Sequence, residues 1–140
     1  MPVQNDSTNA KIPVHGVVGV LCRGSEFLMI QRAEGILAGG AWCFPGGSIE
    51  PGEASADAMV REMREEVHLE VAADRLIWQW TRPDGGLALD FWTAREIRGE
   101  PKPNPAEVQA IRWMTISQMR RLDNALPNLF EFLDLWEAGL

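Results

Sequence analysis

The sequence has no tyrosine, few cysteines and no long apolar run. No apolar stretch approaches the roughly 18 residues that a membrane-spanning helix requires, so we expect no membrane span. The only two cysteines, Cys22 and Cys43, lack the close spacing and partner ligands of a zinc site. No secretory signal precedes them, so we expect buried free thiols rather than a disulfide, and a cytoplasmic location.

The start of the chain also lacks the apolar core of a signal peptide. We expect residues 1–10, which are mostly polar, to form a flexible tail. Residues 11–140 are enough for one domain with a proper core. The composition, 46% hydrophobic and 24% charged, is that of an ordinary globular protein. Without repeats or an interdomain linker, the sequence predicts a single domain.

Positive charge is scarce, with 13 lysines and arginines against 20 acids and a net charge of −7. Affinity for a nucleic-acid duplex depends on basic side chains that neutralise phosphates, so the balance argues against a duplex as partner. A small nucleotide is not excluded, because a bound metal ion can neutralise its charge. The sequence leaves both a monomer and a homodimer open.

Three acids, Glu62, Glu65 and Glu66, lie near the end of an expected amphipathic helix. Helical spacing places them on one face, where their like charges repel. A hard divalent cation would offset this repulsion, since Mg²⁺ and Mn²⁺ prefer oxygen ligands. The alternative is a solvated acidic face, which is common for a charge run.

A glycine turn precedes this helix at Pro45, Gly46 and Gly47. Glycine can adopt positive φ in such a turn and lets another group approach the backbone closely. Arg61 stands next to Glu62, where its guanidinium could hold a carboxylate in a fixed fork, although an ordinary surface arginine is the alternative. A solvated charge run needs neither feature, so both favour a binding site.

The 23-residue segment from Gly47 to Leu69 resembles the Nudix box, G-x5-E-x7-R-E-U-x-E-E-x-G-U, where U is a bulky aliphatic residue. The matching positions are Gly47, Glu53, Arg61, Glu62, Glu65, Glu66 and Leu69. The flank Trp42-Cys43-Phe44-Pro45-Gly46-Gly47 is similar to the W-x-F-P-G-G of MutT-like members.

Two box positions depart from the pattern. Met63 replaces an aliphatic residue, a small change because methionine is apolar and adaptable. His68 replaces the glycine that ends the helix, a position typical of left-handed backbone. We expect His68 to adopt this conformation at a cost of about 1 kcal/mol relative to glycine. Neither departure alters an expected metal ligand.

The resemblance implies an α/β fold, the Nudix α/β/α sandwich with a mixed central sheet. It implies hydrolysis of a nucleoside diphosphate-X pyrophosphate bond, with Mg²⁺ or Mn²⁺ as cofactor and a small-molecule nucleotide as substrate. The first expectation is a nucleoside triphosphate, including oxidised purine deoxynucleotides, cleaved to a monophosphate and pyrophosphate. An ADP-ribose or nucleotide-sugar pyrophosphatase is an alternative, and a nucleotide-sensing binding module is another.

The same resemblance implies roles for the box residues. Glu62, Glu65 and Glu66 are expected to bind the metal, with the backbone of Gly46 and Gly47 close to the metal or the phosphates. Glu53 and Arg61 are expected to form an ion pair that braces the loop onto the helix and so supports the ligands.

The general base stays open between several glutamates. Glu65 or Glu66 could activate water. Glu107 resembles an acidic position after the box that binds metal or acts as base in some members, and a surface glutamate is its alternative. Glu34 and Glu100 are weaker candidates.

Three residues outside the box are expected to bind substrate. Arg32 resembles a phosphate-contacting arginine of MutT-like members, with a loop-anchoring salt bridge as the alternative. Asn124 and Asn128 lie near the position of a base-reading asparagine, because an amide can pair with a purine edge. The alternatives are a turn residue at Asn124 and a solvated helix position at Asn128.

Hydrophobic patterning and turn residues predict the secondary structure. Expected strands are 14–22, 27–31, 42–44, 76–81, 87–94 and 108–114; expected helices are 54–67 with Ser55 as possible N-cap, 117–122 and 127–138; residues 95–106 are expected to form a charged, proline-rich connection. The six tryptophans are expected mostly in the core, with Trp78 and Trp80 on one face of a strand.

Overall fold

A computed structural model describes residues 13–140, so the tail expected at residues 1–10 lies outside the described residues. The strands are β1 (Val14–Arg23), β2 (Glu26–Arg32), β3 (Trp42–Cys43), β4 (Gly46–Ser48), β5 (Glu70–Thr81), β6 (Leu87–Arg98) and β7 (Val108–Met114). The helices are α2 (Ser55–Val67), α3 (Ile116–Arg120) and α4 (Asn128–Glu137).

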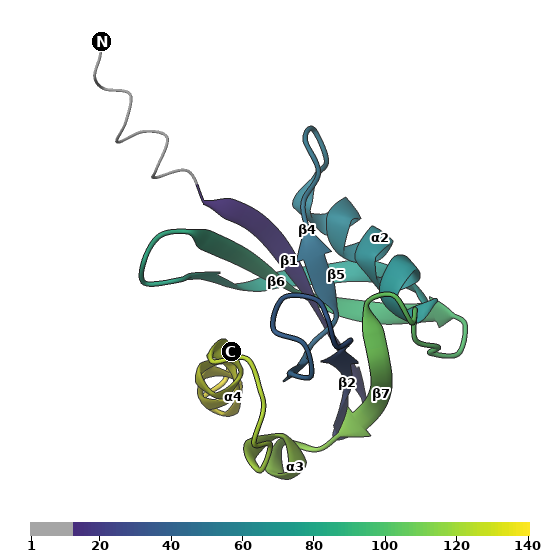
Figure 1. The fold of residues 1–140 in the computed structure, drawn as a ribbon, viewed down its shortest axis with the longest axis vertical. Helices are drawn as coiled ribbons and strands as arrows, with labels where there is room; N and C mark the ends of the chain where they lie inside the picture. The colour runs from purple at the N-terminus through teal and green to yellow at the C-terminus, as the bar shows by residue number, and fades with distance from the viewer. Residues whose placement is uncertain (1–12) are drawn as a thin grey trace.

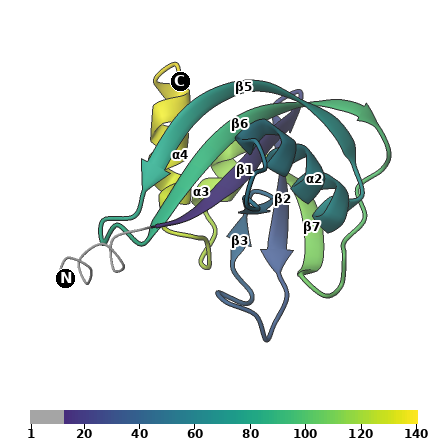
Figure 2. The ribbon, with the colours of Figure 1, turned by 90° about the horizontal axis from the view of Figure 1, so that it is seen from above.

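The strands form one mixed sheet. Its order is β3-β2-β1-β6-β5, with β4 also paired to β1 and β7 to β2. β1 and β6 run parallel, whereas the β1–β2, β1–β4 and β5–β6 pairs are antiparallel. Helix α2 lies across one face of the sheet, and α3 and α4 lie on the other side (Figures 1 and 2). The predicted α/β/α sandwich is therefore confirmed.

Strand alternation divides the core into two layers. On β1, Val17 packs in the cluster beneath α2, while Val20 packs in the cluster that includes α4. Successive strand residues point to opposite faces of a sheet, so one strand serves both layers. The six tryptophans all pack in or against these clusters, and both Trp78 and Trp80 pack against the α4 cluster, as predicted.

Helix α2 begins differently from the prediction. Its N-cap is Ala54, which has extended backbone and no side-chain hydrogen bond at the cap. Ser55 is already helical, and its hydroxyl donates to Asp90 instead, at 2.7 Å. The prediction of Ser55 as N-cap was wrong because a partner distant in sequence uses its hydroxyl.

The end of α2 agrees with the prediction. His68 has φ 60° and ψ 30°, the left-handed conformation that glycine adopts readily. The His68 amide donates to the carbonyl of Arg64 at 3.1 Å, so the helix closes normally. His68 Nδ1 also donates to the carbonyl of Lys102 at 2.9 Å.

The β5–β6 hairpin extends further than predicted. β5 begins at Glu70 rather than residue 76, and β6 ends at Arg98 rather than residue 94. Residues 95–98 are therefore strand and not connection. The pairing of β5 with β6 contains three register irregularities, including one between Leu76 and Trp78. Such bulges interrupt strict alternation, so the period-two pattern hides the strand ends.

The glycines before α2 are not the predicted turn. Gly46 and Gly47 belong to β4, pair with Val18 and Val17 of β1, and do not have positive φ. Their lack of a side chain is still required, because a Cβ at Gly46 would overlap the Val17 carbonyl oxygen. Close approach, rather than backbone freedom, is therefore the reason for glycine here.

Neither cysteine forms a disulfide in the described chain. Cys43 is buried as expected, and burial raises the pKa of its thiol to about 12. Cys22 is exposed, so the prediction of a buried thiol was wrong there; it lies near the end of β1, past the buried stretch of the strand. No helix among residues 13–140 is long and apolar enough to cross a membrane.

Candidate active site

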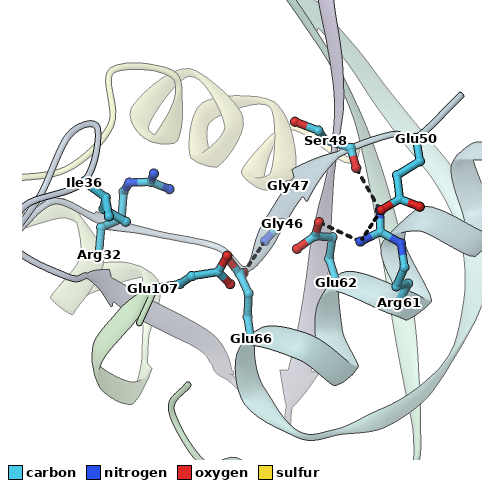
Figure 3. A pocket seen from close by; sticks show the side chains of 10 residues that line it. All are labelled: Arg32, Ile36, Gly46, Gly47, Ser48, Glu50, Arg61, Glu62, Glu66 and Glu107. Atoms are coloured by element: carbon cyan, nitrogen blue, oxygen red, sulfur yellow. Dashed lines mark hydrogen bonds and ion pairs between the residues drawn. The ribbon is translucent and has the colours of Figure 1, made fainter. Parts of the chain in front are cut away.

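A polar cavity of about 270 Å³ opens between α2, β4, the end of β2 and the residue before β7 (Figure 3). The residues that line it are Arg32, Ile36, Gly46, Gly47, Ser48, Glu50, Arg61, Glu62, Glu66 and Glu107. Segments far apart in the sequence therefore converge on the second half of α2.

Two of the box acids lie against the backbone of β4. Glu62 and Glu66 are one turn apart on the sheet-facing side of α2, and only 9% and 5% of their surfaces are exposed. The Gly46 amide donates to Glu66 Oε1 at 2.9 Å. A Cβ at Gly47 would overlap the Glu62 carboxylate. The two glycines thus make room for two carboxylates at the cavity wall.

Burial makes these carboxylates hard to charge. It raises the pKa of Glu66 to about 8, although the Gly46 amide opposes this rise. It raises the pKa of Glu62 to about 7, against the opposing charge of Arg61. A cation bound in the cavity would favour the charged form of both acids. Perturbed acids in one cavity are typical of functional sites.

Arg61 connects three segments around the cavity. Its Nε lies 2.8 Å from Glu53 Oε2, so the predicted ion pair is present. It also donates to the Ser48 carbonyl at 2.9 Å and lies 3.1 Å from both Glu62 Oε2 and Glu65 Oε1. The hydrogen bonds from Arg61 lower the pKa of Glu53 to about 2. Arg61 therefore holds the loop before α2, strand β4 and Glu62 in one arrangement.

Glu65 stands apart from the other two box acids. Its side chain is half exposed, is paired with Arg61 and does not line the cavity. Within residues 13–140, no three acid, histidine or cysteine side chains are close enough to form a ready-made metal cage. A cation here would take further ligands from backbone, water or substrate, which is the usual coordination of Mg²⁺.

The connection before β7 brings a fourth glutamate to the cavity. The amides of Lys102 and Asn104 donate to the carbonyls of Val67 and Glu66, at 2.9 and 3.0 Å. These bonds satisfy carbonyls at the end of α2 that have no partner within the helix. Glu107 then lines the cavity, and its charge contributes to the raised pKa of Glu66.

The two weaker candidates for the base are placed elsewhere. Neither Glu34 nor Glu100 lines the cavity. Glu34 accepts a hydrogen bond from Gln109 at 3.2 Å, and Glu100 is exposed in the connection after β6. The geometry therefore favours Glu66 and Glu107 over them as candidate bases.

Arg32 enters the cavity from the end of β2. Its Nε donates to the Leu37 carbonyl at 2.7 Å and so anchors the loop after β2. The alternative to phosphate binding was a salt bridge that anchors a loop. Arg32 does anchor a loop, but through a hydrogen bond to a backbone carbonyl rather than a salt bridge. The Arg32 side chain also lines the cavity, on the side of Glu107 and across from Glu62 (Figure 3).

The two asparagines lie outside this cavity. Asn128 lines a second, apolar cavity of about 40 Å³ together with Val18, Cys43, Phe44, Leu89, Phe91, Leu126 and Leu129. Val18 pairs with Gly46, so the two cavities share one strand pair. Asn124 lines neither cavity, and its carbonyl accepts from the Trp42 amide at 2.8 Å.

Sequence analysis did not identify every residue at the cavity. Ile36, Ser48 and Glu50 line it, and Asn104 supports it from the connection. Ser48 and Glu50 come just after the glycines of the motif in the sequence, and this position could have indicated that they lie at the cavity. Ile36 and Asn104 lie in loops whose path the sequence pattern does not reveal.

Comparison with known proteins identifies the family. The family model described as the NUDIX domain matches residues 13–136. The chain is 31% identical over 93 residues to the 8-oxo-dGTP diphosphatase of Proteus vulgaris, covering 64% of this chain and 83% of that protein. It is 30% identical over 99 residues to the CTP pyrophosphohydrolase of Escherichia coli, covering 69% of this chain and 72% of that protein.

A solved structure gives the same result. The crystal structure of an ADP-ribose pyrophosphatase from Streptococcus suis superposes with a TM-score of 0.71 and 25% identity. The match covers 91% of this chain and 92% of that one. Together with the box acids beside a glycine strand, these matches show that the chain belongs to the Nudix family.

Proposed function

We propose that this protein is a divalent-metal-dependent pyrophosphohydrolase that cleaves a nucleoside diphosphate-X bond. The observation that carries the proposal is the pair of buried carboxylates, Glu62 and Glu66, held against the glycine backbone of β4. Burying a charged carboxylate costs free energy unless an opposite charge or hydrogen bonds compensate it. A bound cation is the simplest source of that compensation for Glu62 and Glu66.

The residues at the cavity fit such a cation. Carboxylate oxygens are hard ligands suited to Mg²⁺ or Mn²⁺, and Gly47 has no side chain that would displace the Glu62 carboxylate. Glu62 and Glu66 would hold the ion, with the backbone at Gly46 close to it, while Glu65 would stay paired with Arg61 at the rim. When bound, Mg²⁺ or Mn²⁺ screens phosphate charge and lowers the pKa of coordinated water.

Other residues have roles that the geometry supports. Arg32 binds an oxygen of the substrate's phosphates from the opposite wall. Glu107 or Glu66 accepts the proton of the attacking water, since both face the cavity. Arg61 and Glu53 keep Glu62 in place without contacting the substrate. The backbone of Gly47 lines the cavity and would lie close to the phosphates.

The preferred substrate is a nucleoside triphosphate, including oxidised purine deoxynucleotides. The names of the Proteus and Escherichia coli relatives support this class. The Asn128 cavity supports it as well, because an amide among apolar side chains can read a base edge. At about 40 Å³ it is well below the roughly 300 Å³ of small ligand pockets, so the cavity must widen to admit a base.

ADP-ribose is the second candidate. The likeness to the ADP-ribose pyrophosphatase of Streptococcus suis favours it. The two candidates differ in products, because a triphosphate releases pyrophosphate and a monophosphate, whereas ADP-ribose releases AMP and a sugar phosphate.

A product screen tests the proposal. Purified protein is incubated with canonical and 8-oxo-purine triphosphates, ADP-ribose and nucleotide sugars, with Mg²⁺, Mn²⁺ or EDTA, and the products are separated by chromatography. We expect metal-dependent release of pyrophosphate and a nucleoside monophosphate. Release of AMP from ADP-ribose alone would select the second candidate. Tight nucleotide binding without turnover of any compound would contradict both and favour a sensing module.

A further inference from the structure

Besides Glu62 and Glu66, a third acid is buried, and it lies outside the cavity. Asp90 on β6 is only 4% exposed and accepts three side-chain hydrogen bonds. The donors are Ser55 Oγ at 2.7 Å, Gln79 Nε2 at 3.1 Å and His15 Nε2 at 3.2 Å. The Ser55 hydroxyl in turn accepts from the Trp92 indole at 2.8 Å. None of these residues lines the cavity, so the proposed reaction does not use them directly.

The three donors come from three different elements. Ser55 lies in the first turn of α2, Gln79 on β5 and His15 on β1. Asp90 therefore connects the start of the helix with two neighbouring strands of the sheet. A buried carboxylate is costly unless hydrogen bonds compensate it, and these three donors supply that compensation.

The bond to Ser55 acts on the same helix stripe as the metal-binding acids. Ser55, Met59, Glu62 and Glu66 follow each other at helical spacing on the sheet-facing side of α2. At 1.5 Å per residue, Glu62 lies only about 10 Å along the axis from Ser55. A helix is stiff over that length, so fixing Ser55 fixes both the rotation and the axial position of Glu62.

The site tolerates little error in that position. The Glu62 carboxylate occupies the space that a Cβ of Gly47 would fill, so any rotation of α2 moves it into or away from β4. The start of α2 has no side-chain cap at Ala54, so the Ser55 hydroxyl, which is bonded to Asp90 and Trp92, is its polar anchor to the sheet. A displacement of about 1 Å at a catalytic group can cost roughly 100-fold in rate.

We infer that Asp90 is a positioning residue that acts through Ser55 to align the metal-binding acids of α2 with β4. The inference rests on the proposed function, since it presumes a cation at Glu62 and Glu66. Gln79 and His15 hold Asp90 from the sheet side, and only Ser55 transmits its position to the helix.

Matched variants separate this role from simple stabilisation. Ser55→Ala removes the donor on α2, whereas Gln79→Ala removes a donor to the same carboxylate from β5. Ser55→Thr retains the hydroxyl. The measurement is Mn²⁺ binding without nucleotide, followed by the electron paramagnetic resonance signal of free Mn²⁺. Melting temperatures are measured in parallel.

We expect Ser55→Ala to bind Mn²⁺ about tenfold more weakly than the wild type, the size of effect seen when support of a metal ligand is lost. Gln79→Ala and Ser55→Thr should bind within about twofold of the wild type. Equal Mn²⁺ affinity in Ser55→Ala and Gln79→Ala would overturn the inference, whatever their melting temperatures. If the wild type itself bound no Mn²⁺, the proposed function would fail first, and the inference with it.

Discussion

At the scale of residues, three similar glutamates have different surroundings. Sequence spacing places Glu62, Glu65 and Glu66 on one helix face and cannot distinguish them further. The structure buries Glu62 and Glu66 at the cavity and leaves Glu65 half exposed beside Arg61. The difference arises from the glycines of β4, against which the carboxylates of Glu62 and Glu66 pack. This contact depends on the pairing of β4 with β1, which the sequence did not predict.

This difference predicts unequal effects of conservative substitutions. Glu66→Gln should lower kcat by at least about 100-fold, because it removes a buried charged ligand from the reaction centre. Glu65→Gln, the matched control, should lower kcat by about tenfold or less. Steady-state hydrolysis with Mg²⁺ measures both, and circular dichroism establishes that both fold. A larger loss in Glu65→Gln would contradict the placement of these acids.

At the scale of elements, the type and order of the helices and strands could be predicted from the sequence better than their first and last residues. β7 was predicted with its observed bounds, because most of its residues are apolar and a proline-rich connection precedes it. β5 and β6 were predicted too short, since bulges break their alternation. The start of α2 was assigned to a capping serine whose hydroxyl in fact binds Asp90. Local pattern therefore fails where a distant partner decides the conformation.

The left-handed end of α2 gives a prediction about stability. His68→Ala and His68→Gly both lose the hydrogen bond to the Lys102 carbonyl, so their comparison isolates the backbone. His68→Gly should be more stable than His68→Ala by about 1 kcal/mol, because only glycine adopts positive φ without steric cost. Urea unfolding of the two variants measures the difference. Equal stability would show that residue 68 leaves the left-handed conformation when substituted.

At the scale of the whole molecule, the site depends on contacts between distant segments. The sequence could identify Glu66 and Arg32 as candidates by resemblance, and it placed the sandwich fold correctly. It could not show that Glu107 reaches the same cavity, because this requires the backbone bonds between the connection and the end of α2. It also gave no sign of the buried Asp90, whose partners lie on three elements.

The raised pKa values of Glu62 and Glu66 predict how the whole fold responds to pH without metal. In the unfolded chain both carboxyls titrate near 4.5, whereas in the folded protein they titrate at about 7 and about 8. The folded state therefore binds more protons between pH 4.5 and 8, and stability falls as the pH rises through this window.

Urea unfolding in EDTA at several pH values measures this effect. Relative to a Glu62→Gln, Glu66→Gln double variant, the wild type should lose stability on the order of 6 kcal/mol between pH 5 and pH 8. Saturating Mg²⁺ should remove most of this loss, because it stabilises the charged carboxylates of the folded state. A wild-type profile parallel to that of the double variant would mean that the two acids are not buried as described.

The most direct test of the account is calorimetric titration of Mn²⁺ into protein saturated with a non-hydrolysable nucleoside triphosphate analogue. The account predicts Mn²⁺ uptake by the wild-type complex and its loss in the Glu62→Gln, Glu66→Gln double variant, with the fold of both intact. Uptake of the same stoichiometry and affinity in the two proteins would contradict it, because the cation would then be bound elsewhere.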